Sequence, residues 1–168
     1  MIIVKQDFFK PDLCNLIAKG AEAYKWQYNH KSIMDDPTHS KFFVSHLWSE
    51  GSQENFFSIL WRLIRKGIPF VGDCYCWRII ANGQVNGQDG NWHRDYGDKT
   101  VLYFPLEWVS EWGGPTYFKI AEREMQIQYK QNQIVAFDSK ILHYGSSPAV
   151  GNVLRISIAF NLRVNEVT

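Results

Sequence analysis

Two histidines, one aspartate and one arginine have the types and spacing that chemistry requires. His93 and Asp95 belong to the run WHRDY and lie two positions apart, so in an extended segment their side chains point the same way. His143 lies in a later strand-like run and offers a third ligand. Two imidazoles and one carboxylate on one face of a metal leave coordination positions open, as is typical of non-haem Fe(II). The sequence therefore predicts that His93, Asp95 and His143 bind iron and form the catalytic centre.

The last strand-like run, residues 153–162, has one apolar and one polar face. Alternation along it sets Ile156, Ile158, Phe160 and Leu162 against Arg155, Ser157, Ala159 and Asn161. Ordinary β-sandwiches turn their apolar faces inward, so a polar face on a covered sheet indicates that something polar is enclosed. An inward arginine is costly unless it is paired, which makes a bound anion the expected partner. Arg163 shares this face and is the alternative anchor, but its place near the chain end suits a rim residue better.

An octahedral Fe(II) held by three protein ligands has three positions left. Two would suit a chelating 2-oxo acid and one would suit O2. If the acid is 2-oxoglutarate, its distal carboxylate needs a planar, bidentate cation, for which arginine is better than lysine. We therefore expect Arg155 to bind 2-oxoglutarate, with Ser157 and Tyr103 as further hydrogen-bond donors.

The elements before residue 72 are predicted to be mainly helical. A short opening strand precedes a helix that starts at Pro11, and a second helix follows with Ser52 and Glu54 as its caps. The polar run 28–40 is predicted to be a loop, and 41–48 a strand. From residue 72 onward short strands alternate with turns such as Asn82-Gly83. The predicted strands are 73–80, 100–106, 115–119, 125–129, 133–137, 140–144 and 153–162.

This order predicts a mainly β fold with flanking α-helices. We expect one domain over residues 1–168, in which 1–71 supply helical support and 72–168 form an antiparallel sandwich or barrel. The loops 28–40 and 82–91 are expected to frame the mouth of its pocket. Isolated histidines are more often ordinary residues than ligands, which is our interpretation of His30, His39 and His46.

Composition excludes several classes of protein. The formal net charge of the 168 residues is +1, so no nucleic-acid partner is expected. No apolar run approaches the ~20 residues that span a bilayer, so no membrane association is expected. The three cysteines are odd in number and lack zinc spacing, which favours reduced thiols and a cytoplasmic location.

The chain resembles the 2-oxoglutarate- and Fe(II)-dependent oxygenase superfamily, nearest its prolyl 4-hydroxylase-like branch. The matching motifs are His93-x-Asp95, Tyr103 with Trp108, Gly113-Gly114 leading to Phe118, Val135-Ala136-Phe137, Leu142-His143, Arg155-x-Ser157 and the N-terminal FFKPDLCNLI. The resemblance implies a double-stranded β-helix, also called a jelly roll and cupin-like, with the N-terminal helices on its major sheet. It also implies oxidative decarboxylation of 2-oxoglutarate to succinate and CO2, with ascorbate as a candidate auxiliary reductant. Ile80 and Pro115-Thr116 depart from the pattern of many relatives.

The leading hypothesis is a dioxygenase that hydroxylates a peptidyl, prolyl-type residue or a free amino acid. A catalytically silent β-helix module that binds a ligand or a protein is the first alternative, although the intact set of four site residues argues against it. A nucleobase-directed oxygenase is the second, and the near-neutral charge disfavours it.

Overall fold

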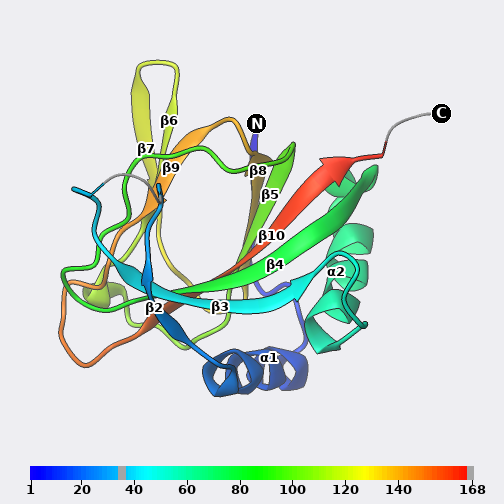
Figure 1. Cartoon of the computed structure of the whole chain (residues 1–168), viewed down its shortest axis with the longest axis horizontal. Helices are drawn as coiled ribbons and strands as arrows, with labels where there is room; N and C mark the ends of the chain where they lie inside the picture. The colour runs from blue at the N-terminus through cyan, green and yellow to red at the C-terminus, as the bar shows by residue number, and fades with distance from the viewer. Residues whose placement is uncertain (34–36, 166–168) are drawn as a thin grey trace.

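The computed structural model describes residues 1–33 and 37–165, which form two antiparallel sheets and two α-helices (Figure 1). The elements are β1 (Ile2–Lys5), α1 (Pro11–Ala23), β2 (Gln27–His30), β3 (Phe42–Ser49), α2 (Phe56–Gly67), β4 (Cys74–Gln84), β5 (Lys99–Phe104), β6 (Thr116–Ile120), β7 (Arg123–Ile127), β8 (Gln133–Asp138), β9 (Leu142–Gly145) and β10 (Arg155–Val164). Short 3-10 turns lie at Pro69–Val71 and Ser110–Trp112. None of the described helices is long and apolar enough to cross a membrane.

The strands form a large and a small sheet. The seven-stranded sheet has the order β1-β8-β5-β10-β4-β3-β2, and the three-stranded sheet has the order β7-β6-β9. The β6–β7 hairpin projects beyond the rest of the molecule (Figure 1). Two facing antiparallel sheets with this order make a jelly roll, so the predicted double-stranded β-helix with flanking helices is confirmed.

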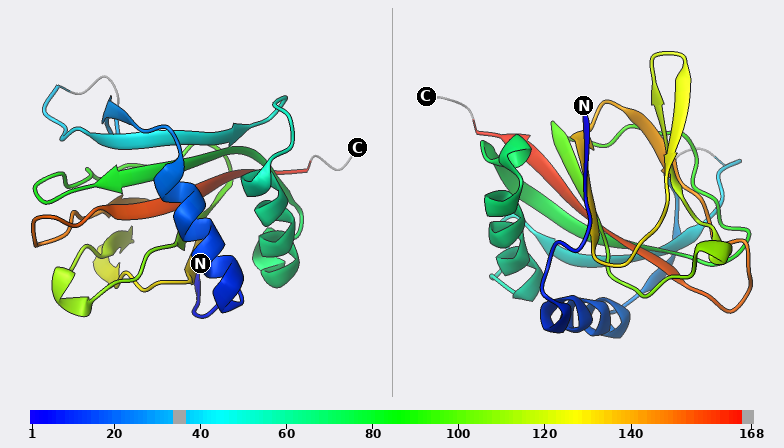
Figure 2. Two further views of the ribbon diagram at one scale, coloured as in Figure 1. Left: turned by 90° about the horizontal axis from the view of Figure 1, so that it is seen from below. Right: turned by 180° about the vertical axis from the view of Figure 1, so that it is seen from behind.

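Helices α1 and α2 pack on one face of the large sheet (Figure 2). Their apolar side chains, such as Ile17 and Phe57, pack against the apolar, helix-covered face of β10 in one cluster. That face of β10 consists of Ile156, Ile158, Phe160 and Leu162, as the alternation predicted. The opposite face of the same strand is therefore left to the space between the two sheets.

Helix α2 begins with a capping box at Asn55. The Asn55 side chain accepts a hydrogen bond from the Ser58 backbone N–H at 3.1 Å, and the Ser58 hydroxyl accepts one from the Asn55 N–H at 2.9 Å. The prediction of Ser52 and Glu54 as caps was therefore wrong by one to three positions. Asn55 also donates to the Leu47 carbonyl at 2.7 Å, which ties the start of the helix to β3.

Two other local predictions differ from the structure. The run predicted as the loop 28–40 includes most of β2, an exposed edge strand paired with β3, and its residues 34–36 lie outside the described residues. The strand was not predicted because its side chains are mostly polar: an edge strand with solvent on both faces shows no alternation of apolar and polar residues. Gly83 lies inside β4 and not in a turn. A Cβ at Gly83 would lie 2.9 Å from the Trp26 ring, so close packing of that indole explains the glycine.

Candidate metal centre and its cavity

His93 and Asp95 lie in the loop between β4 and β5, and His143 lies on β9. The backbones of His93 and His143 exchange two hydrogen bonds of 3.0 Å, which form an isolated β-bridge. The Asp95 N–H donates to the Ser139 carbonyl, also at 3.0 Å. These three bonds hold an otherwise irregular loop against the β8–β9 corner, so the two segments present their side chains together.

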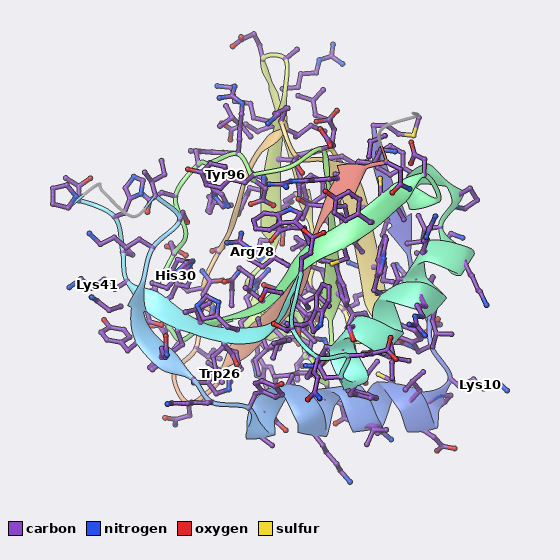
Figure 3. All side chains as sticks on the ribbon, turned by 45° about the vertical axis from the view of Figure 1, so that its right-hand side comes forward. Lys10, Trp26, His30, Lys41, Arg78 and Tyr96 are labelled. Carbon is purple, nitrogen blue, oxygen red and sulfur yellow. The ribbon has the colours of Figure 1, made fainter. Side chains whose placement is uncertain are left out.

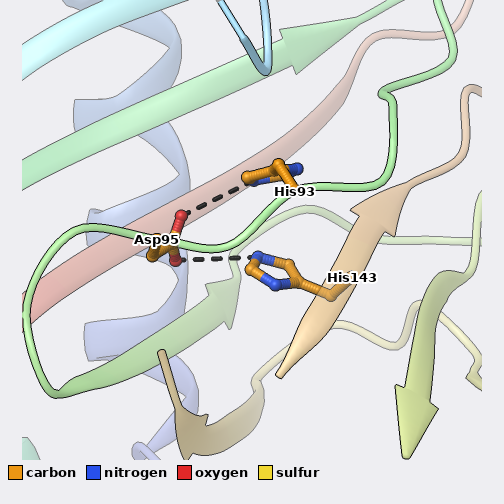
Figure 4. Close-up of side chains that lie close together, drawn as sticks. All are labelled: His93, Asp95 and His143. Atoms are coloured by element: carbon orange, nitrogen blue, oxygen red, sulfur yellow. Dashed lines mark ion pairs between the residues drawn. The ribbon is translucent and has the colours of Figure 1, made fainter. Parts of the chain in front are cut away.

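The three side chains converge on one point (Figure 4). One ligand atom from each residue lies within 4.8 Å of the others. The Nε2 atoms of His93 and His143 lie 3.5 Å and 3.6 Å from the two carboxylate oxygens of Asp95. The structure thus brings together all three residues that the sequence predicted as metal ligands.

The hydrogen bonds behind the imidazoles set their tautomers. His93 Nδ1 lies 2.8 Å from the Asn91 carbonyl, and His143 Nδ1 lies 2.9 Å from the Ile141 carbonyl. Because a carbonyl can only accept, each Nδ1 carries a proton and donates it. A neutral ring then has its lone pair on Nε2, which is the atom that faces Asp95. A metal-binding histidine usually donates its other ring N–H to a carbonyl in this way, which fixes the orientation of the ring.

The protonation states also suit a divalent cation. Burial would raise the pKa of Asp95, but the contacts with His93 and His143 and a 2.7 Å hydrogen bond from Thr100 lower it to about 2. Burial lowers the pKa of His143 to about 4, so its ring is neutral at pH 7. Burial opposes protonation of His93, and the contact with Asp95 outweighs it and raises that pKa. A cation that binds here meets an ionised carboxylate and releases at most the His93 proton.

A cavity of about 510 Å³ opens from this triad between the two sheets. Its floor consists of paired residues on β10 and β4, namely Arg155 with Gln84, Ser157 with Asn82, Ala159 with Ile80 and Asn161 with Arg78. Thr100, which bonds Asp95, is the β5 partner of Asn161. The triad therefore lies at the Asn161 end of this floor, and Arg155 lies at the far end.

Arg155 is 1% exposed, and its charge has no acidic partner within residues 1–33 and 37–165. Its Nε donates to the Gly114 carbonyl at 2.7 Å, and its two terminal nitrogens donate to Gln84 Oε1 at 3.0 Å and Thr116 Oγ1 at 2.9 Å. All three acceptors are neutral, and burial lowers the pKa of Arg155 to about 10. No carboxylate among the described residues forms an ion pair with it.

Sequence analysis did not predict which residues orient Arg155, although two of them, Gly114 and Thr116, lie in segments that it singled out. Gly114 is the second glycine of the Gly113-Gly114 pair, and Thr116 belongs to the Pro115-Thr116 pair that departs from the pattern of the family that the sequence resembles. A Cβ at Gly114 would lie 3.1 Å from Arg155 Cδ, and Gly114 has φ +69°, so both the space and the backbone favour glycine. The role of Gln84 could not be predicted from the sequence, because it depends on the pairing of Gln84 with Arg155 on the neighbouring strand.

Tyr103 does not lie in this cavity, so the prediction that it donates to 2-oxoglutarate was wrong. It pairs with Ile158 and therefore shares the helix-covered face of the sheet. Its hydroxyl donates toward Asn132 Oδ1 at 3.2 Å and Cys14 Sγ at 3.3 Å. Arg163, the alternative anchor, is exposed and lies over the Trp77 ring, outside the lining of the cavity.

Comparison with known proteins gives a match in structure and not in sequence. No protein-family model matches this chain, and no curated protein is detectably similar to it. Among solved structures, a prolyl-4-hydroxylase from Pseudomonas putida is 14% identical, with a TM-score of 0.69 over 98% of this chain and 92% of that one. An oxidoreductase of the 2OG-Fe(II) oxygenase family from Burkholderia pseudomallei is 10% identical, with a TM-score of 0.76 over 96% and 84%. A viral collagen prolyl hydroxylase from Paramecium bursaria Chlorella virus-1, solved as a 2OG complex, is 12% identical, with a TM-score of 0.68 over 98% and 96%.

Identities this low support a statement about architecture. The double-stranded β-helix of this chain, which carries a His-Asp-His cluster at one end of its cavity, is the fold of the prolyl hydroxylases and 2OG-Fe(II) oxygenases to which it is similar.

Proposed function

We propose that this protein is a 2-oxoglutarate- and Fe(II)-dependent dioxygenase that hydroxylates a peptidyl, prolyl-type residue or a free amino acid. One observation carries the proposal. A cluster of three side chains that could hold a metal ion lies at one end of the cavity, and a buried arginine with no acidic partner among the described residues lies at the other end. A dicarboxylate that chelates the metal with one end and meets the guanidinium with the other fits both requirements.

In this proposal His93, Asp95 and His143 hold Fe(II), and Arg155 binds the distal carboxylate of 2-oxoglutarate. When bound, iron supplies the activation of O2 that is coupled to decarboxylation of 2-oxoglutarate to succinate and CO2. Arg155 has five N–H donors, and its contacts use three of them. One N–H on each terminal nitrogen remains, which is the pair that a bidentate carboxylate needs. Ser157 is 4% exposed, lines the same cavity two residues along, and offers a further hydroxyl.

The substrate class rests on likeness of fold. The similar structures include a prolyl hydroxylase in complex with a peptide fragment of hypoxia inducible factor from Trichoplax adhaerens, which is 12% identical with a TM-score of 0.70. A prolyl-type peptide or an amino acid is therefore the first substrate to test. Fold alone does not determine substrate, so the reaction class and the substrate need separate experiments.

The reaction class can be tested without a known substrate. Fe(II) and 2-oxoglutarate are added anaerobically, and the visible charge-transfer band of their complex is followed. Oxygen is then admitted, and succinate is measured. The wild-type protein should show both signals, His143→Ala should show neither, and Arg163→Gln should behave as wild type. A protein that forms the band and never forms succinate would instead be a silent binding module. Absence of both signals would refute the proposal.

A further inference from the structure

A second arginine lies in the same cavity, at the end occupied by the candidate metal ligands. Arg78 is on β4, half-buried, and pairs with Asn161 on β10. Its Nε donates to Asn161 Oδ1 at 3.1 Å, and its guanidinium lies 4.7 Å over the Trp77 ring. These two contacts hold the side chain over the cavity floor and leave its terminal nitrogens available.

The charge of Arg78 has no acidic partner in the part of the chain that the structure describes. The one acidic side chain among the described residues that line the cavity is Asp95, whose oxygens face the two imidazoles and Thr100. Burial lowers the pKa of Arg78, and the nearby charge of Asp95 opposes that shift. The guanidinium stays protonated, because an arginine keeps its proton at any pH near 7. The Arg78 guanidinium can therefore bind an anionic group of a ligand.

Other groups around the mouth of the cavity are also basic. Lys31 and Arg94 line it together with His30. Burial and the charge of Arg78 lower the pKa of His30 to about 4, so this ring is neutral and adds hydrogen-bonding capacity without charge. Figure 3 shows His30, Arg78 and Tyr96 on the side of the large sheet away from α1. Asp95 is the one acidic side chain among the described lining residues, so positive charge predominates in the cleft, and such a cleft concentrates anionic ligands.

The proposed ligands would not neutralise this end of the cavity. In a count of net charge, the two positive charges of Fe(II) balance the two negative charges of 2-oxoglutarate. The single negative charge of Asp95 balances the single positive charge of Arg155, although the two side chains do not touch. The charge of Arg78 then remains, next to the place where a substrate must lie to reach the metal. The whole cavity, about 510 Å³, falls within the size range of small-molecule sites and must also hold 2-oxoglutarate. These limits favour a small anionic substrate.

We infer that Arg78 determines substrate specificity by binding a carboxylate of the substrate, which would be a free amino acid or the C-terminal residue of a short peptide. Arginine suits this task, because its planar fork matches a carboxylate with two parallel hydrogen bonds. The inference rests on the proposed function, since it takes the triad as the place of reaction.

The inference can be tested with the full chain loaded with Mn(II) and N-oxalylglycine, an unreactive mimic of 2-oxoglutarate. The probes are a panel of L-amino acids, each offered as the free acid, as the primary amide, and as the last residue of a glycyl dipeptide acid. Paramagnetic broadening of probe protons reports binding near the metal, even when that binding is weak. We expect at least one acid to bind roughly tenfold or more tightly than its amide, the effect of one bidentate charged contact. The dipeptide arm shows whether the carboxylate belongs to a free amino acid or to a peptide end.

Variants then assign the preference to Arg78. Arg78→Gln should bring acid and amide to equal affinity, and Arg78→Lys should keep part of the difference. Arg163→Gln is the matched control, because Arg163 lies over the same Trp77 ring at 5.0 Å and is exposed outside the cavity. It should leave the ratio of acid to amide affinity unchanged.

Two failures can be told apart. If the wild-type protein binds Mn(II) but no acid is preferred over its amide, or if the preference survives Arg78→Gln, the role of Arg78 is overturned and the proposed function stands. If the electron paramagnetic resonance spectrum of Mn(II) shows no binding to the wild-type protein, the proposed function fails, and the role of Arg78 fails with it.

Discussion

Replacing Arg155 with glutamine should selectively remove recognition of the distal carboxylate of 2-oxoglutarate. Three of the Arg155 N–H groups are used by Gly114, Gln84 and Thr116, which orient the fork and leave two N–H groups for a ligand. Glutamine keeps a polar amide, is shorter than arginine by two bonds, and loses the charge. We therefore expect a loss of co-substrate affinity with the candidate metal cluster of His93, Asp95 and His143 intact.

The size of the effect follows from burial. A hydrogen bond to a charged group contributes about 1.5–3 kcal/mol, and removing one partner of a buried charged pair costs about 2–5 kcal/mol. Arg155 is 1% exposed, so its contact with a ligand is shielded from bulk water. A loss of about 3 kcal/mol corresponds to a Kd for 2-oxoglutarate that is roughly 100-fold higher.

The assay is a thermodynamic cycle between side chain and ligand. Calorimetry on the Mn(II)-loaded protein measures the Kd of 2-oxoglutarate and of 2-oxobutanoate, which lacks the distal carboxylate, for wild type and Arg155→Gln. Wild type should prefer 2-oxoglutarate strongly, the variant should bind both ligands with similar affinity, and Arg163→Gln should match wild type. If the variant weakened both ligands equally, or if wild type did not distinguish them, Arg155 would not be the anchor of the distal carboxylate.

Substitutions at three further residues test the structure at separate places, with Ser52→Ala as the control for one of them. Tyr103→Phe should lower the free energy of unfolding in urea by about 1 kcal/mol and leave the Kd of 2-oxoglutarate unchanged, since its hydroxyl bonds on the helix-covered face. Asn55→Ala should cost about 1 kcal/mol of stability through the lost cap, whereas Ser52→Ala should stay within about 0.5 kcal/mol of wild type. His30 has a pKa of about 4 in the fold against 6.5 for a free side chain, so the unfolded state binds more protons between these values and stability falls as the pH drops from 6.5 to 4. In urea titrations of the metal-free protein across that range, His30→Gln should remove about 2 kcal/mol of this fall, and an unchanged pH profile would contradict the shift.

The parts of the site that sequence could predict are those with a clear periodicity. Residues 155–162 alternate between polar and apolar side chains, so the inward direction of Arg155 followed from spacing alone. The strand that contains Tyr103 is different, because five of its six residues are buried and both of its faces are apolar. Alternation cannot then identify the inner face, and the pairing of Tyr103 with Ile158 decides it. Arg78 was missed for a related reason, since its partner Asn161 is distant in sequence and meets it through sheet register.

The two-sided character of β10 has a consequence for how this protein can diversify. The strand lies near the middle of the large sheet, with the apolar core on one side and the cavity on the other. A one-residue shift in the register of β10 would exchange its two faces and place Arg155 against the helices. An insertion or deletion in β10 would therefore disrupt both the core and the cavity. Evolutionary change in which ligand the cavity accepts is thereby channelled to positions at its rim, such as residues 30–33 and Trp92, Arg94 and Tyr96 between the candidate metal ligands, where a substitution can change the bound ligand and leave the fold unchanged.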